Sequence, residues 1–156
     1  MTDEAFRENV LQLLRGGNAH VPFEKAVGDF PEPLRDKMPR GLPYSGWQLL
    51  EHMRITQWDI LEYIRKPDHV SPGWPDGYWP ENPAPARKAW GQSVKAFQAD
   101  RRMLLDLAAS GDLLAPIPHE VNGPTLLHEL LLVADHTAYH LGEMVLLRRV
   151  LGAWKG

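Results

Sequence analysis

The segment from Leu126 to Leu151 constrains the fold of this chain more than any other part of the sequence. Leucine, valine and alanine recur through it and Gly152 follows it, so the pattern predicts one long helix. His136 and His140 lie four residues apart within the segment. Four residues advance by about 40° around a helix and by about 6 Å along it, so both imidazoles leave the same face. The two side chains can therefore share one ligand.

Two explanations fit this histidine pair. One is a metal ion, which for zinc would lie about 2.0–2.1 Å from each imidazole nitrogen and would need further ligands from elsewhere in the fold. The other is a pair of hydrogen-bonded core histidines. The His-Glu-x-x-His motif of zinc proteases is absent, because Thr137 follows His136. No Glu is followed three residues later by His, which argues against a carboxylate-bridged di-iron bundle.

Length, charge and composition exclude several classes of protein. A chain of 156 residues is long enough for one compact domain, so we expect a single domain over residues 1–156. The formal net charge of −3 includes no basic block, which argues against nucleic acid as a partner. There is no cysteine, so thiol chemistry would need a thiol supplied by a cosubstrate. The charged N-terminal residues and short apolar runs predict a cytoplasmic protein without a membrane partner.

Helical periodicity recurs in four segments. A capping box at Ser45 and Gln48 marks the start of the second helix, and Pro67 prevents its continuation past about Arg65. A proline-rich connection over residues 18–43 includes a short amphipathic piece, Phe23 to Phe30. Four helices with apolar stripes and no strand pattern predict an all-α fold, a four-helix bundle with long crossover loops. The expected helices cover residues 3–15, 45–65, 85–110 and 126–151.

A third histidine, His52, lies among the apolar residues of the second helix. A buried imidazole without a partner would cost free energy, so His52 needs one. In a bundle, the inner face of this helix can meet that of the last one and bring His52 to His136 and His140. Three imidazoles leave a coordination position open, as catalytic metal sites do. Glu51 and Arg54 lie off this stripe, and we expect them to be solvated.

Residues Pro67 to Pro85 hold six prolines, two glycines, two tryptophans and one tyrosine, so they cannot form a helix. Because Trp74, Tyr78 and Trp79 are costly to leave in water, we expect a loop held onto the bundle by its aromatic rings. The alternative is an aromatic lid over a ligand site, and one loop can serve as both. His69 and His119 lie in loops and are expected at the surface.

Four motifs of the chain resemble the DinB-like superfamily of metal-dependent enzymes. The resemblance implies a four-helix bundle, commonly dimeric, with a metal on one histidine of the second helix and two of the fourth, which here are His52, His136 and His140. The better understood members are thiol-dependent transferases and isomerases, such as bacillithiol transferases and mycothiol-dependent maleylpyruvate isomerase, and most have no assigned reaction. The motifs are Trp47-Gln-Leu-Leu-Glu-His52, Asp59-Ile-Leu-Glu-Tyr63, Gly73-Trp-Pro-Asp-Gly-Tyr-Trp-Pro80 and Ala134-Asp-His-Thr-Ala-Tyr-His-Leu-Gly-Glu-Met144.

One departure from the family pattern is Glu143, where glutamine is frequent. It projects within about 20° of His136 around the helix, so it is a candidate for an additional ligand or for a carboxylate that supports one. Glu143 and Asp59 are the two candidates for a catalytic general base. The implied cofactor is a divalent metal, zinc or nickel first, with iron and manganese as alternatives. The implied partner is a small-molecule substrate, with a low-molecular-weight thiol as one candidate.

Two functions follow as hypotheses. The first is an enzyme, a thiol-dependent transferase or isomerase or a hydrolase, whose metal lowers the pKa of a bound thiol or water. The second is a non-catalytic metal or small-ligand binding protein of a stress response.

Other residues of the last helix carry weaker expectations. Leu130 to Val133 make it apolar around its whole circumference, which predicts a homodimer. His128 lies about 80° from His136 around the helix and is not expected to be a ligand. Tyr139 is assigned to packing or an interface, and Gly142 to a close helix contact.

Overall fold

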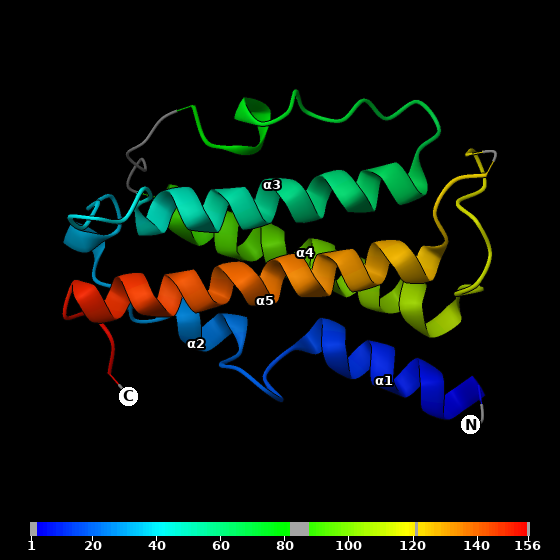
Figure 1. Ribbon diagram of the computed structural model, residues 1–156, viewed down its shortest axis with the longest axis horizontal. Coiled ribbons are helices and arrows are strands. Elements are labelled where there is room, and N and C mark those ends of the chain that lie inside the picture. Colours follow the sequence, from blue (N-terminus) through cyan, green and yellow to red (C-terminus); the bar gives the residue numbers. More distant parts are fainter. Residues whose placement is uncertain (1–2, 82–87, 121, 156) are drawn as a thin grey trace.

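The computed structural model describes residues 3–81, 88–120 and 122–155, and Figure 1 shows their arrangement. Within these residues the only strand-like feature is an isolated bridge between Pro116 and Thr125. The structure therefore confirms the expected all-α bundle, with one short helix added. Its α-helices are α1 Asp3–Arg15, α2 Phe23–Val27, α3 Gly46–Arg65, α4 Ala89–Ser110 and α5 Leu126–Val150, and its 3₁₀ turns are η1 Glu32–Leu34 and η2 Asp76–Tyr78.

Local chemistry accounts for the ends of the helices. At the start of α3, the Gln48 backbone N–H donates to Ser45 Oγ and the Ser45 N–H donates to Gln48 Oε1, which confirms the capping box. Thr125 caps α5 by accepting from the His128 N–H. Gly111 ends α4 as expected. The expected start of that helix at Pro85 lies outside the described residues.

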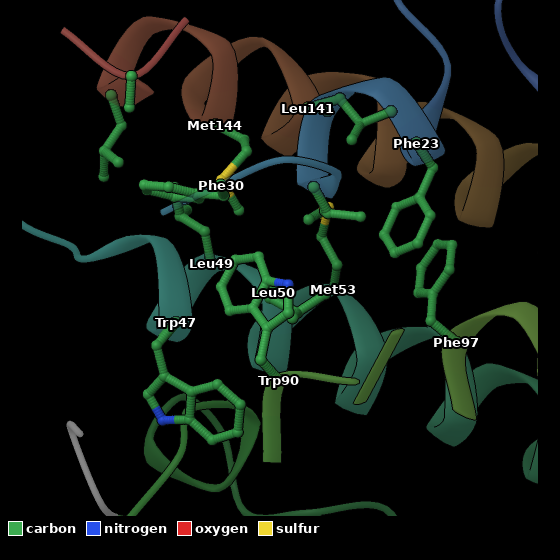
Figure 2. Close-up of a cluster of buried hydrophobic side chains, with 14 residues drawn as sticks. Phe23, Phe30, Trp47, Leu49, Leu50, Met53, Trp90, Phe97, Leu141 and Met144 are labelled. Carbon is green, nitrogen blue, oxygen red and sulfur yellow. The ribbon is translucent and has the colours of Figure 1, made fainter. Parts of the chain in front are cut away.

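The long helices pack with their apolar faces together. Helix α3 contacts both α4 and α5, and α1 also packs on α4 and α5. Figure 1 shows the segment after α3 turning back and running along that helix. Figure 2 shows one of two apolar clusters, in which residues from α2, α3, α4 and α5 meet. Its fully buried members include Phe23, Phe30, Leu50, Met53, Phe97 and Met144.

The guanidinium of Arg148 joins the end of α5 to α2. Arg148 is only 3% exposed, and it donates to the backbone carbonyls of Lys25, Ala26, Gly28 and Ala153. Its guanidinium also lies over the ring of Phe30. Because three of these acceptors, on Lys25, Ala26 and Gly28, are backbone carbonyls at the end of a five-residue helix, one side chain satisfies groups that the short helix leaves unpaired. Arg148 therefore fixes α2 and the C-terminal residues to the bundle.

Two expectations from the sequence are wrong. Glu51 is not solvated but only 8% exposed, because Ser93 of α4 donates to it and Arg54 makes two hydrogen bonds with it at 2.8 Å. Arg54 itself is half-buried by the same pairing. Gly142 makes no close helix contact, since a Cβ placed there would meet nothing within 4 Å.

None of the described helices is long and apolar enough to cross a membrane.

Candidate metal centre

Three histidines meet between α3 and α5. His52 comes from the first half of α3, and His136 and His140 come from successive turns of α5. The Nε2 atom of His52 lies 3.1 Å from Nε2 of His140 and 3.1 Å from Nε2 of His136. One ligand atom from each of the three lies within 4.8 Å of the others, so the group could hold a metal ion. The structure thus brings together the three histidines that the sequence predicted.

Two of these imidazoles are held in a defined tautomer by groups outside the cluster. His52 Nδ1 donates to the backbone carbonyl of Tyr78 at 2.9 Å, and His140 Nδ1 donates to Glu143 Oε2 at 2.7 Å. A neutral imidazole that is protonated at Nδ1 carries its lone pair at Nε2. When both rings are neutral, His52 and His140 therefore turn two Nε2 lone pairs toward each other, with the nitrogen atoms 3.1 Å apart. Such an arrangement is repulsive unless a cation lies between the nitrogens.

The geometry fits a small divalent cation. Two nitrogens of a tetrahedral zinc site, each about 2.0–2.1 Å from the ion, lie about 3.3–3.4 Å apart. The two separations from His52 Nε2, 3.1 Å each, are close to this value. Hydrogen bonds from the remote ring nitrogen to a carbonyl or carboxylate are the usual partners of metal-bound histidines. The donor set of three imidazoles therefore fits the implied metal.

Burial also favours the uncharged form that binds metals. It lowers the pKa of His136 to about 3, with His140 and His52 adding a smaller effect of the same sign. Burial lowers the pKa of His52 as well, although the Tyr78 carbonyl partly opposes this. A lowered pKa means that the imidazole stays neutral near pH 7 and keeps a lone pair available. Protons therefore compete weakly for these nitrogens.

The loop after α3 covers one side of the site. The indole of Trp79 stacks on the His52 ring with centroids 4.1 Å apart and planes within 5°, and Tyr44 stacks on Trp79 at 4.3 Å. The expectation that the loop aromatics pack onto the bundle is thus correct for Trp79. It is wrong for Trp74, which is 81% exposed and touches the ring of Tyr78.

Asp59 anchors this loop to α3. His69 Nε2 donates to one carboxylate oxygen at 2.7 Å, and the Tyr78 hydroxyl donates to the other at 2.7 Å. Burial and the carboxylate raise the pKa of Tyr78 to about 12, so this hydroxyl keeps its proton. The expected surface position of His69 is wrong, because its side chain is 7% exposed. The surface position of His119 is wrong too, since its ring is half-buried against Tyr63.

The remaining candidates of α5 lie around the cluster. Glu143 is about a third exposed and contacts His140 without joining the three-histidine group. His128 is exposed and lies outside this group, as expected. Tyr139 is 65% exposed, and its ring meets the His140 ring edge-on at 4.9 Å. The role of the Tyr78 carbonyl in orienting His52 could not be predicted from the sequence, because any residue type carries the same backbone carbonyl.

The three imidazoles lie in a cleft of about 660 Å³. Most of its walls come from α3, from α5 and from the loop between α3 and α4. On α3, the residues after His52 that line it are Thr56, Asp59 and Ile60. The volume lies within the range of about 300–1,000 Å³ that is common for small-molecule sites. The aromatic residues of the cleft are Tyr44, Trp74, Tyr78, Trp79 and Tyr139.

A helical bundle with three histidines converging between two of its helices has the fold and the candidate metal site of the family that the sequence motifs resemble. The family model of the DinB superfamily matches residues 19–144, which include all three histidines. The chain belongs to the DinB superfamily. Comparisons with curated proteins and with solved structures found no significant match.

Proposed function

We propose that this protein is a metal-dependent enzyme that binds one divalent cation through Nε2 of His52, His136 and His140 and acts on a small molecule in the adjoining cleft. The observation that carries the proposal is the 3.1 Å separation of the Nε2 atoms of His52 and His140. Their Nδ1 atoms are already committed to Tyr78 and Glu143. A polar core without a metal would place a proton between these nitrogens.

The bound cation would act as a Lewis acid, lowering the pKa of a coordinated thiol or water so that a nucleophile is available near neutral pH. The protein's own groups prepare this site. Glu143 and the Tyr78 carbonyl fix the ring orientation of His140 and His52. Trp79 covers the face of His52 and keeps water from it. The reactions that suit this arrangement are thiol transfer, thiol-dependent isomerisation and hydrolysis.

Of the two carboxylates, we propose Glu143 as the general base. It is about a third exposed and lies against a ligand, so it can reach a proton on a group bound beside His140. Both oxygens of Asp59 are engaged by His69 and Tyr78, and we assign Asp59 to positioning the loop. Glu143 also accepts the Nδ1 proton of His140, and a carboxylate engaged in this way is less free to act as a base. A non-catalytic metal-binding protein is therefore the second candidate. Turnover of a thiol or ester substrate by the metal-loaded protein would separate the two.

Three imidazoles without a carboxylate ligand favour zinc or nickel over iron or manganese.

The proposal is tested by metal analysis of untagged protein after reconstitution with each ion. We expect close to one ion per chain in the wild type and a severe loss in His52→Ala, His136→Ala and His140→Ala. His128→Ala is the matched control, because His128 is exposed on the same helix and should leave binding unchanged. Full occupancy in His52→Ala would overturn the three-histidine site.

We also propose that the chain forms a homodimer through α5. Leu130 and Val133 are buried within the bundle, whereas Leu131 and Leu132 are each more than 40% exposed. Further exposed apolar residues of the same helix continue this surface toward its C-terminal end. They are Leu146 and Val150. An apolar stripe of this length is typical of an interface between protein chains.

A further inference from the structure

Lysine and arginine are missing from the described part of the cleft lining. The one carboxylate among the described lining residues, Asp59, accepts hydrogen bonds on both oxygens and offers no group that could pair with an anion. An anionic group on a ligand, placed away from the metal, would lose hydration without gaining a cationic partner among these residues. The cleft therefore disfavours ligands that carry several carboxylates.

Two aromatic rings at the edge of the cleft are largely uncovered. Trp74 is 81% exposed and Tyr139 is 65% exposed, although both line the cleft. They come from different elements, the loop after α3 and helix α5. Trp79 and Tyr44, by contrast, are already stacked on each other. Uncovered rings beside a cleft of this size are suited to stacking against a flat apolar ligand.

We propose that the cleft selects an uncharged aromatic substrate, which stacks between Trp74 and Tyr139 while its reactive polar end lies at the three histidines. The inference rests on the proposed function for the chemistry at that polar end. The ligand preference itself follows from the lining. A thiol with an apolar aromatic body would suit the cleft, whereas a thiol bearing several carboxylates would find no cation beyond the metal.

The preference can be measured with two fluorescent probes that differ in one charged group. N-phenyl-1-naphthylamine is uncharged, and 8-anilinonaphthalene-1-sulfonate has the same rings with an added sulfonate. Both are titrated into the metal-free protein, so the outcome does not depend on metal binding. We expect the uncharged probe to bind at least about tenfold more tightly, because the sulfonate would be desolvated without a cation. Equal or tighter binding of the sulfonate would overturn the proposal.

Variants place the probe in the cleft. Trp74→Ala and Tyr139→Ala should each weaken binding of the uncharged probe by about fivefold to tenfold, because each loses one stacking ring. Both side chains are largely exposed, so neither change should prevent folding. Leu114→Ala is the control, since Leu114 is 69% exposed but does not line the cleft. Loss of affinity in the control alone, or in none of the variants, would refute the assignment.

A second titration separates this inference from the proposed function. The zinc content of the same wild-type sample is measured after reconstitution, and the probe titration is then repeated on the reconstituted protein. Preference for the uncharged probe with no bound zinc would remove the metal function and leave the cleft assignment standing. One zinc per chain with no probe preference would leave the metal function and remove the substrate class.

Discussion

The carboxylate of Glu143 should control metal affinity without being a ligand. It accepts the Nδ1 proton of His140 at 2.7 Å, which fixes the tautomer and makes Nε2 a stronger donor. Removing such a carboxylate typically lowers metal affinity about 10-fold to 100-fold. Glu143 is about a third exposed, so solvent weakens the interaction. We therefore expect Glu143→Ala to raise the zinc dissociation constant by about 10-fold to 30-fold, in the lower part of that range.

Glu143→Gln gives a graded test of the same contact. The amide oxygen can still accept from His140, but a hydrogen bond to a charged acceptor is roughly twice as strong as a neutral one. Half of the free-energy loss of the alanine variant corresponds to about a threefold to fivefold weaker affinity. The assay is a competition titration of the metal-free variants with zinc against a chromophoric chelator. Asp135→Asn removes the same charge from an exposed position of α5 and should stay near wild type.

Three outcomes would refute this reasoning. Wild-type affinity in Glu143→Ala would show that the hydrogen bond to His140 has no effect on the metal. An equal loss in the glutamine and alanine variants would indicate that Glu143 itself coordinates the ion. A loss in Asp135→Asn as large as that in Glu143→Gln would assign the effect to net charge rather than to the contact.

Four further predictions concern stability and assembly. Arg148→Met should lower the free energy of unfolding by about 3–5 kcal/mol in urea titration, because four backbone carbonyls lose their donor; a change below about 1 kcal/mol would contradict this role. Trp79→Ala should lower the melting temperature by several degrees, whereas Trp74→Ala should leave it within about one degree, since only Trp79 is packed. The pKa of His136 is lowered in the folded state, so below about pH 6.5 the unfolded state binds more protons than the folded state does. The metal-free protein should therefore lose stability as the pH falls from about 6.5 toward 3. A urea midpoint that stays constant over that range would contradict the burial of this imidazole. Light scattering at micromolar concentration should give twice the 17.7 kDa of one chain, and a mass near 17.7 kDa would exclude the homodimer.

Features that depend on local spacing could be predicted from the sequence. The four-residue separation of His136 and His140 places both on one helix face whatever the rest of the chain does. The hydroxyl of Ser45 and the amide of Gln48 cap α3 through a motif that is local in sequence. His52 was predicted less directly, from its place on an apolar stripe together with the family motif. Helix content and the pair His136 and His140 therefore follow from short-range patterns, whereas His52 needed the family motif.

Features that depend on partners far along the chain could not be predicted. Arg148 is buried because carbonyls of residues more than 100 positions earlier surround it. Glu51 was assigned to solvent from the helix pattern alone, whereas Ser93 of α4 covers it. Trp74 and Trp79 lie in the same loop with similar neighbours, and one is packed while the other is exposed. No local rule distinguishes such cases, since burial is decided by the packing of distant elements.

The loop after α3 contributes to the metal centre as directly as the helices do. Packing of α3 against α5 brings the three imidazoles together, but it does not determine which nitrogen of His52 carries the proton. Tyr78 settles this, because its carbonyl accepts from His52 Nδ1 while its hydroxyl binds Asp59 on the same helix. Since Asp59 lies about two turns beyond His52, these two contacts hold Tyr78 along a fixed stretch of α3. The carboxylate of Asp59 thus influences the candidate metal centre through Tyr78. Tyr78 also lines the cleft, so the same residue orients His52 and forms part of the cleft wall.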